Sequence, residues 1–339
     1  MIENAIMKLS EGQDLTFNET NQVIDEIMTG KTTSVQISSF LTALSVKKET
    51  VEEIAGAADA MRAHALDFEA DEPVLEIVGT GGDHSNSFNI STTSALVVAA
   101  TGIPVAKHGN RAASSKSGAA DVLESLGVQI NLDPKRSEAI LNQIGICFLF
   151  AQEYHKAMKY VAPIRKELGI RTLFNVLGPL ANPAHATNQV LGVYDESLVE
   201  PMAKVLDQLN VKNATVIHGQ DGFDEASISA PTTVMEVHDG KFNKYEITPE
   251  QFGLRRANKD EVIGGTPQEN AAITLDVLNG VQGARRDVIL LNSALAIHTA
   301  KPEVSLQAAI EQAKTVIDNG SAMKELQEFI RLTEEGVAA

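Results

Sequence analysis

The 339-residue chain contains a single cysteine, Cys147, and no tryptophan. One thiol excludes a disulfide within the chain and a metal centre built from several thiolates, and it favours a reducing compartment. Cys147 stands in an apolar run at 147–150, so we expect it to belong to the hydrophobic core.

Basic residues are scarce relative to acidic ones. Lys and Arg number 28 against 45 Asp and Glu, which gives a formal net charge of −17 and a pI of about 4.9. Proteins that bind nucleic acids by general electrostatic attraction have the opposite balance. The composition therefore excludes that class, and we expect no nucleic-acid partner.

Long apolar runs are also missing. The most apolar stretch, 95–106, is interrupted by Thr101, Gly102 and Pro104, and it is much shorter than the ~20 residues of a membrane-spanning helix. The N-terminal residues include Glu3 and lack the basic segment followed by an apolar one that marks a signal peptide. The sequence thus predicts a soluble cytoplasmic protein with no membrane partner.

The composition is that of a globular protein, because 43% of the residues are hydrophobic and 22% are charged. The length predicts roughly two domains. Approximately the first 65 residues show only helical periodicity, with a helix predicted to end at Gly30 and another to begin at a capping box formed by Thr50 and Glu53.

Strands and helices alternate after Pro73. Helices are predicted at 91–100 and 118–126, and a third is predicted to begin at a capping box of Ser197 and Glu200. Apolar runs typical of strands occur at 74–78, 103–106, 147–150, 189–193 and 214–217. This alternation predicts βαβ units and a mainly parallel sheet. The C-terminal third is predicted to be mostly helical, with a capping box of Thr266 and Glu269 at the start of one of its helices.

The segment 163–183 interrupts the alternation. It contains Arg165 and Arg171 and ends in Gly-Pro-Leu-Ala-Asn-Pro. It is either a long loop or a piece that leaves the sheet and returns, and the pattern does not choose between them.

Residues 84–120 contain no acid, although the average density of acidic residues in this chain corresponds to about five in that length. The same segment contains His84, His108, Lys107, Arg111 and Lys116. A local excess of cations and small polar donors in an acidic protein indicates an anion site.

Two turns in this region have the composition of anion-binding turns. Gly-Thr-Gly-Gly-Asp at 79–83 joins a predicted strand to a helix, where backbone N–H groups can face an anion. It matches neither the dinucleotide fingerprint nor the P-loop, so by itself it is either a phosphate loop or a tight connection. At the start of the next helix, Ser91 or Thr92 is either an N-cap, the interpretation favoured in isolation, or a ligand.

The segment 107–118 has the strongest pattern. It combines three cations with three serines and two glycines, which favours polyphosphate binding over a solvated basic loop. Asp224 and Glu225 form one of seven adjacent acid pairs in the chain, and only their position after a predicted strand suggests binding of a hard cation. The eight histidines show no spacing typical of metal ligands.

Taken together, these segments resemble the anthranilate phosphoribosyltransferase family over nearly the whole chain. The resemblance rests on the motifs at 79–83, 89–92, 107–115, 165, 175–183 and 224–225, in that order. It implies an α/β fold of the nucleoside phosphorylase and phosphoribosyltransferase type. A small helical domain at 1–68 and 165–187 would carry the dimer contact, and a larger domain with a central sheet would comprise 69–164 and 188–339.

The resemblance also implies a role for each matched residue. Phosphoribosyl pyrophosphate would contact Gly79, Gly82, Asp83, Ser87, Asn89, Ile90, Ser91, Thr92, Lys107, His108, Gly109, Asn110, Arg111, Ala112, Ala113, Ser114, Ser115 and Ala119. Anthranilate would contact Gly79, His108, Asn110, His155, Arg165, Gly178 and Pro179. Mg²⁺ would be bound by Ser91, Asp224 and Glu225, and Lys107 and Arg165 would be the catalytic residues.

Two matched positions differ from what is common in the family. Ser87 replaces the usual Thr and keeps the hydroxyl, whereas Ala119 replaces the usual Ser and loses one possible phosphate donor. Such a loss costs about 1 kcal/mol if the donor makes a direct contact.

Two other functions remain as alternatives. A pyrimidine nucleoside phosphorylase shares the implied architecture, but its Ser-Gly-Arg and Thr-Gly-Gly-Thr motifs are absent. A non-enzymatic relative that binds nucleic acid would need a basic stripe, which the net charge of −17 opposes. The expected partners are the two substrates and a second copy of the chain.

Overall fold

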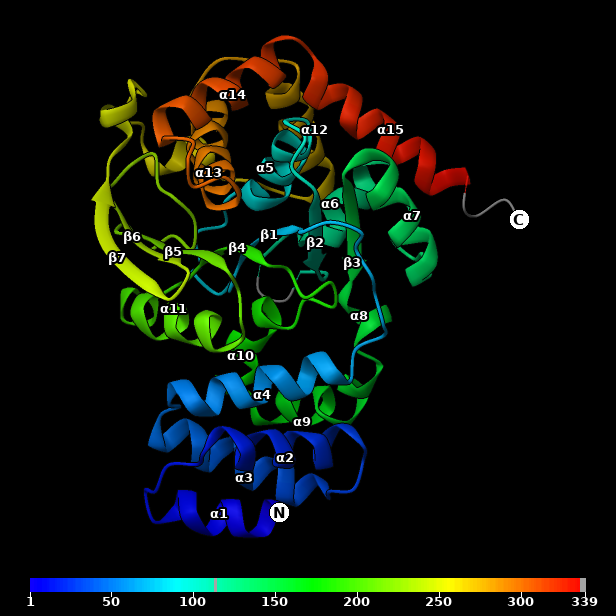
Figure 1. Cartoon of the computed structure of the whole chain (residues 1–339), viewed down its shortest axis with the longest axis vertical. Helices are drawn as coiled ribbons and strands as arrows, with labels where there is room; N and C mark the ends of the chain where they lie inside the picture. Colours follow the sequence, from blue (N-terminus) through cyan, green and yellow to red (C-terminus); the bar gives the residue numbers. More distant parts are fainter. Residues whose placement is uncertain (113–114, 336–339) are drawn as a thin grey trace.

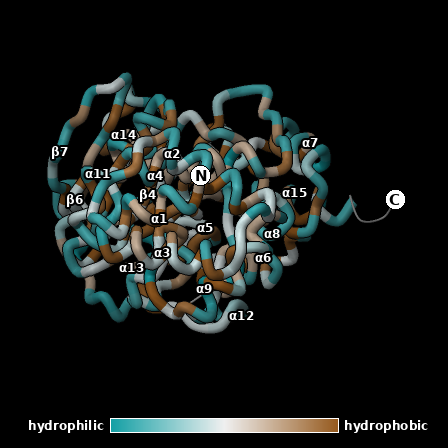
Figure 2. The backbone as a smooth tube through the Cα atoms, turned by 90° about the horizontal axis from the view of Figure 1, so that it is seen from below, coloured by the Kyte–Doolittle hydropathy of each residue, from teal (hydrophilic) through white to brown (hydrophobic). Residues whose placement is uncertain are grey.

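The computed structural model describes residues 1–112 and 115–335. A layer of helices lies below a central sheet, and further helices cover the upper face of that sheet (Figure 1). The lower layer is formed by α1 (Ile2–Ser10), α2 (Phe17–Met28), α3 (Ser34–Lys47) and α4 (Val51–Ala63). The view from below shows this layer in front of the rest of the molecule (Figure 2).

Three of these four helices begin at a capping box. The predicted box of Thr50 and Glu53 is confirmed, and Thr16 with Glu19 and Thr33 with Gln36 form two more. Each box satisfies backbone N–H groups that a helix start leaves without partners.

The sheet has seven strands in the order β3-β2-β1-β4-β5-β6-β7. The first five are mutually parallel, as the alternation predicted: β1 (Leu75–Gly79), β2 (Val105–Gly109), β3 (Ile146–Phe150), β4 (Asn188–Gly192) and β5 (Asn213–Gly219). Cys147 lies buried in β3, as expected.

Two antiparallel strands extend the sheet beyond β5, and the sequence did not predict them. They are β6 (Thr232–His238) and β7 (Lys241–Ile247). Most of β7 is exposed at the sheet edge and carries Lys241 and Lys244, so it lacks the apolar alternation of a half-buried strand. The C-terminal third is otherwise mostly helical, as predicted.

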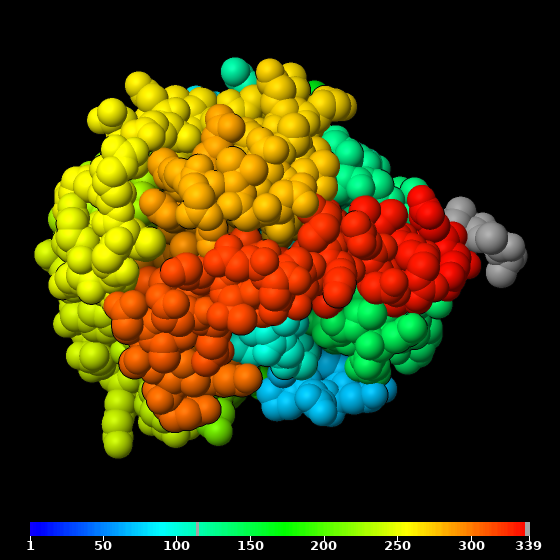
Figure 3. Space-filling view, turned by 90° about the horizontal axis from the view of Figure 1, so that it is seen from above, coloured from blue at the N-terminus to red at the C-terminus, as the bar shows by residue number. Residues whose placement is uncertain are grey.

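Helices cover both faces of the sheet. The upper face packs against α5 (Ile90–Ala99) and α13 (Ala284–Ala300), and α6 (Ala119–Leu126), α7 (Pro134–Ile144) and α12 (Pro267–Leu278) lie around them. Two further helices, α14 (Leu306–Asp318) and α15 (Ser321–Glu335), run across the top of the molecule (Figure 3). The predicted capping box of Thr266 and Glu269 starts α12.

Below the sheet, α11 (Val199–Gln208) lies between β5 and α4. The capping box predicted for Ser197 and Glu200 was wrong, because the Asp195 side chain accepts the Ser197 N–H and caps a short 3₁₀ turn, Glu196–Leu198, that precedes α11. One apolar cluster joins α11 and the lower sheet face to the helical layer, so these parts share a core.

The segment after β3 leaves the sheet and packs on the helical layer. It comprises α8 (Ala151–Tyr154), a 3₁₀ turn Lys156–Tyr160, α9 (Ala162–Leu168), α10 (Phe174–Leu177) and a 3₁₀ turn Gly178–Leu180. The turn at 156–160 contacts α2, α9 contacts α3, and α10 contacts α4. The segment 163–183 is therefore not a long loop. It is part of a piece that leaves the sheet and returns to it only at β4.

In the described part of the chain, no helix is long and apolar enough to cross a membrane.

A polar cluster ties α13 to the edge of the sheet. His298 Nε2 lies 3.1 Å from Glu236 Oε1 on β6, and the Tyr245 hydroxyl on β7 donates to the same oxygen. The hydrogen bond to Glu236 raises the pKa of His298. Burial alone raises the pKa of Glu236, but the bonds from His298 and Tyr245 bring it below its ordinary value.

We therefore expect Glu236→Gln to destabilise the protein more at pH 5.5 than at pH 8.5. A raised histidine pKa contributes stability below the unfolded value of about 6.5, and this contribution is lost as the pH rises through the folded pKa. The half-buried pair should contribute about 1 kcal/mol or less. Urea unfolding at the two pH values measures the difference. Glu246→Gln on β7 is the control and should show no such pH dependence, and equal losses for Glu236→Gln at both pH values would contradict the prediction.

Candidate active site

A cavity of about 770 Å³ opens at the carboxyl ends of β1, β2 and β4. Strand order reverses between β1 and β4, and in open α/β sheets ligands bind at such a switch point. A second part of the cavity wall comes from the segment that packs on the helical layer, through Arg165, Phe174 and Gly178.

The glycine turn at 79–83 follows β1 and lines the cavity, as its sequence suggested. Gly81 and Gly82 have φ values of +68° and +74°, which favour glycine, and the Gly81 N–H donates to Asp224 Oδ2 at 2.6 Å. A Cβ at Gly79 would overlap the Asp224 carboxylate, and one at Gly192 would overlap the Asp224 backbone carbonyl. Glycine at the ends of β1 and β4 is what allows the Asp224 loop to approach.

Asp224 and Glu225 are buried in the loop between β5 and β6, and both line the cavity. Burial, followed by the nearby Asp83 and Glu225, raises the pKa of Asp224 well above its ordinary value. Burial also raises the pKa of Glu225 to about 7, although Lys107 opposes the rise. The Ser91 N–H donates to Glu225 Oε1 at 3.1 Å, so the loop reaches the start of α5.

These oxygens fit a divalent cation that is also bound by a phosphate ligand. Asp83 Oδ2 is buried without a hydrogen-bond partner in the described structure, and it belongs to the same group of carboxylates. Residues 1–112 and 115–335 contain no group of three or more His, Cys, Asp or Glu side chains arranged to hold a metal. Mg²⁺ typically uses one or two carboxylates and takes its other ligands from water and substrate phosphates.

The interpretation of Ser91 or Thr92 as an N-cap was wrong. Asn89 occupies the N-cap position of α5 and forms no side-chain capping bond there. Its side chain instead accepts from Asn270 Nδ2 and Ser117 Oγ and donates to the Ser117 carbonyl. The Ser91 and Thr92 side chains, which line the cavity, are therefore not used for capping.

Lys107, in the middle of β2, is a buried cation of the cavity wall. Its Nζ donates to the Ile77 carbonyl at 2.7 Å. Burial lowers the pKa of Lys107, while Glu76 and Glu225 oppose this effect. Glu76 on β1, which sequence reasoning missed, is fully buried, and burial raises its pKa to about 8. Glutamate in the middle of an apolar strand was the only signal for it in the sequence.

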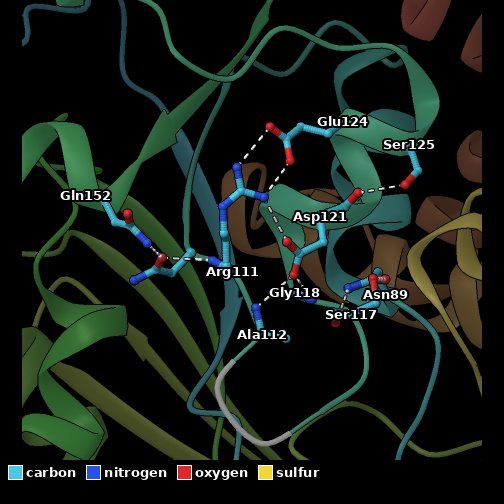
Figure 4. Close-up of polar contacts among 10 residues, drawn as sticks. Asn89, Arg111, Ala112, Ser117, Gly118, Asp121, Glu124, Ser125 and Gln152 are labelled. Carbon is cyan, nitrogen blue, oxygen red and sulfur yellow. Dashed lines mark hydrogen bonds and ion pairs between the residues drawn. The ribbon is translucent and has the colours of Figure 1, made fainter.

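Arg111 is part of the cavity wall, and its guanidinium points to two acids on α6 (Figure 4). Its Nη1 and Nη2 atoms donate to Asp121 and Glu124 on α6, at 3.0 Å for Asp121 and 2.9 Å for Glu124 Oε1. Asp121 also accepts the N–H groups of Ala112 and Gly118, which fixes both ends of this loop. Ala113 and Ser114, also expected to bind phosphate, lie outside the described residues.

Asn110, His108, Gly178 and Pro179 line the cavity together with Arg165. Arg165 lies over the Phe174 ring with its guanidinium carbon 5.6 Å from the centroid, and burial lowers its pKa. It forms no ion pair with any described residue. An arginine with no acidic partner in a partly apolar site suits an anionic planar ligand.

His155 lies behind this wall rather than on it. The His108 and His155 rings meet edge to face with centroids 5.1 Å apart. Burial lowers the pKa of His108 well below its ordinary value and lowers that of His155 to about 4, so both rings are neutral at pH 7.

The remaining expected residues all line the cavity, namely Gly82, Ser87, Ile90, Gly109, Ser115 and Ala119. Arg171, Asn175 and Tyr194 also line it, and none of the three was among the expected ligand contacts. Arg171 was visible as a cation in the interrupting segment, but no spacing connected it with the glycine turn.

Comparisons of the sequence with family models and with known proteins identify the same kind of protein. Residues 3–65 match the model of the glycosyl transferase family helical bundle domain, and residues 71–323 match that of the family's a/b domain. The chain is similar to anthranilate phosphoribosyltransferase of Lacticaseibacillus casei, with 57% identity covering 99% of this chain and 98% of the relative. For the enzyme of Methanobrevibacter smithii the identity is 56%, with coverages of 98% and 99%.

Solved structures of anthranilate phosphoribosyltransferases are also similar to this chain. The anthranilate phosphoribosyltransferase of Thermus thermophilus superposes with a TM-score of 0.93 at 41% identity, covering 97% of this chain and 99% of that one. The Saccharomyces cerevisiae enzyme in complex with PRPP and Mg has a TM-score of 0.90 at 32% identity, with 98% of each chain covered. The same yeast enzyme has been solved with 4-fluoroanthranilate.

Proposed function

The chain belongs to the anthranilate phosphoribosyltransferase family, and we propose that it transfers the 5-phosphoribosyl group of phosphoribosyl pyrophosphate to the amine of anthranilate. The products are N-(5-phosphoribosyl)anthranilate and pyrophosphate, in tryptophan biosynthesis. The observation that carries this conclusion is the division of one cavity into two walls. One wall has a glycine turn, a helix start, a buried lysine and carboxylates, and the other has an arginine that forms no ion pair with the residues that the structure describes.

The first wall would bind the leaving group. Substitution at the ribose C1 breaks the bond to pyrophosphate, so negative charge grows on the leaving oxygens. Lys107, the N–H groups of the glycine turn and the start of α5 would stabilise this charge at fixed positions. Each tenfold increase in rate requires about 1.4 kcal/mol of stabilisation that is specific to the transition state.

Asp224, Glu225 and Ser91 would hold Mg²⁺, with Asp83 close by. When bound, the ion supplies positive charge that neutralises the pyrophosphate. The protein's own part is to keep oxygen donors buried and close to the glycine turn, which the Gly81 bond to Asp224 and the Ser91 bond to Glu225 support.

The second wall would orient the acceptor. Arg165 would pair with the anthranilate carboxylate, with Asn110, His108, Gly178 and Pro179 around the ring and His155 behind it. An aniline-type amine is neutral at pH 7, so the reaction does not require a strong general base. The contribution of Arg165 is therefore one of positioning the amine for attack.

We extend the proposal to domains, assembly and compartment. The helical domain would comprise 1–68 and 165–187 and the α/β domain 69–164 and 188–339, which the contacts of α9 with α3 support.

A homodimer would form through the helical domain. Met7 on α1 and Val35 and Val46 on α3 are 58%, 76% and 77% exposed, and association would remove this apolar surface from water. Sedimentation velocity tests the dimer. The buried single thiol suits the cytoplasm.

The direct test of the function is an assay with purified protein, anthranilate, phosphoribosyl pyrophosphate and Mg²⁺. We expect anthranilate fluorescence to decay and N-(5-phosphoribosyl)anthranilate and pyrophosphate to appear in equal amounts. No decay with protein whose fold is confirmed by circular dichroism would contradict the proposal.

We expect Arg165→Ala to raise the KM for anthranilate by tenfold or more and to change the KM for phosphoribosyl pyrophosphate little. The variant loses a charge-assisted bond of about 1.5–3 kcal/mol to the anthranilate carboxylate. Steady-state kinetics with each substrate varied in turn measures both constants. Lys166→Ala, at the exposed neighbouring position, is the control, and an unchanged anthranilate KM in Arg165→Ala would refute the role.

We expect Asp224→Asn combined with Glu225→Gln to lower activity and to raise the Mg²⁺ concentration needed for half-maximal rate. Neutral amides replace both carboxylates without changing their volume, so the main loss is cation affinity. Activity is measured as a function of Mg²⁺ concentration. Asp71→Asn with Glu72→Gln neutralises an exposed acid pair and is the control. A double variant at 224–225 with the metal dependence of the unmodified protein would exclude the assignment.

A further inference from the structure

Arg171 lies six positions after Arg165, on the segment that packs against the helical layer, and its side chain crosses to the glycine turn. We propose that Arg171 is a positioning residue that holds the turn at 79–83 in its phosphate-binding form, so that it serves phosphoribosyl pyrophosphate while Arg165 serves anthranilate. This inference rests on the proposed function of the cavity.

The main contact is a hydrogen bond from Arg171 Nη2 to the Gly82 carbonyl, 3.0 Å long. In a trans peptide the carbonyl and the following N–H point in opposite directions. A carbonyl held by Arg171 therefore turns the Asp83 N–H away from the arginine. The N–H groups of Gly82 and Asp83 have no acceptor among the described residues. Successive free N–H groups in such a turn form an anion-binding nest.

Arg171 is itself fixed from two directions. Its guanidinium carbon lies 4.0 Å from the centroid of the Tyr194 ring, and the Tyr194 N–H donates to Thr80 Oγ1 at 3.2 Å. At the other end, Ser45 Oγ on α3 donates to the Arg171 carbonyl at 3.0 Å. A continuous series of contacts thus runs from the helical layer through Arg171 and Tyr194 to the turn.

The charge of Arg171 is also available to a ligand. Within residues 1–112 and 115–335 it forms no ion pair, and it lines the same cavity as Lys107 and Gly82. This differs from Arg111, whose charge is neutralised by Asp121 and Glu124. A planar guanidinium can stack on Tyr194 and bond to Gly82 at once, whereas a lysine ammonium cannot do both.

The test compares the two arginines by their effect on each KM. We expect Arg171→Ala to raise the KM for phosphoribosyl pyrophosphate by tenfold or more and to leave that for anthranilate within twofold, the reverse of Arg165→Ala. Arg171→Lys should recover only part of the loss. Tyr194→Leu, which removes the aromatic platform, should raise the KM for phosphoribosyl pyrophosphate, whereas Tyr194→Phe keeps the platform and should not. Lys166→Ala is the control and should change neither constant.

Calorimetric titration with phosphoribosyl pyrophosphate and Mg²⁺ measures the same loss of affinity without turnover. An inactive unmodified protein would therefore contradict the proposed function, while the titration would still decide the role of Arg171. Unchanged phosphoribosyl pyrophosphate binding in Arg171→Ala overturns the inference. Equal increases in both KM values also overturn it, because they indicate a general structural role. If Arg171→Ala does not fold, Arg171→Lys and the two Tyr194 variants carry the same comparison.

Discussion

Asp224 approaches the ends of β1 and β4 so closely that only glycine fits at Gly79 and Gly192. The loop after β5 would otherwise be displaced, and the Gly81 N–H would lose its acceptor. Because Glu225 follows directly and accepts the Ser91 N–H, the same approach connects the carboxylates to the start of α5. The glycine turn, the helix start and the acidic loop thus occupy one small space because two strands end in residues without a side chain.

This arrangement places several buried carboxylates close together, which is unfavourable for their charged forms. Three carboxylates, those of Asp83, Asp224 and Glu225, are grouped there, and burial and mutual repulsion raise the pKa of Asp224 and Glu225. Lys107, on the same cavity wall, is buried, and burial lowers its pKa. A polyphosphate bound with a divalent cation carries charges of both signs. The phosphates can pair with Lys107, and the cation can pair with the carboxylates. The net charge of −17 belongs to the molecule as a whole, whereas the cavity wall combines both signs.

The two walls of the cavity come from parts of the chain with different packing partners. Lys107 and the glycine turn belong to the sheet, whereas Arg165 and Arg171 belong to a segment that contacts α3 and α4. The relative placement of the two substrates therefore depends on how the helical layer packs on the lower sheet face. The shared apolar cluster fixes this packing, and Arg171 is the side chain that connects the helical segment directly to the glycine turn.

Local patterns were sufficient wherever the physical cause is local. The parallel strands followed from apolar runs between helices, and the Thr50 and Thr266 boxes followed from their spacing. Local patterns failed where a partner outside the pattern itself decides. Asp195 replaced Ser197 as a cap, β7 formed because β6 offers it an edge, and Arg111 turned to Asp121 and Glu124, just beyond the acid-free segment.

The sequence by itself determined the order of the parallel strands, the family and the chemical character of the site, because these depend on residue types and short spacings. Only the tertiary structure decided which charges remain available and which are neutralised. It brought Asp224 to Gly79, across 145 positions of the chain, and Arg171 to Gly82, across 89. Such contacts depend on how strands and helices pack, and no local pattern in the chain records them.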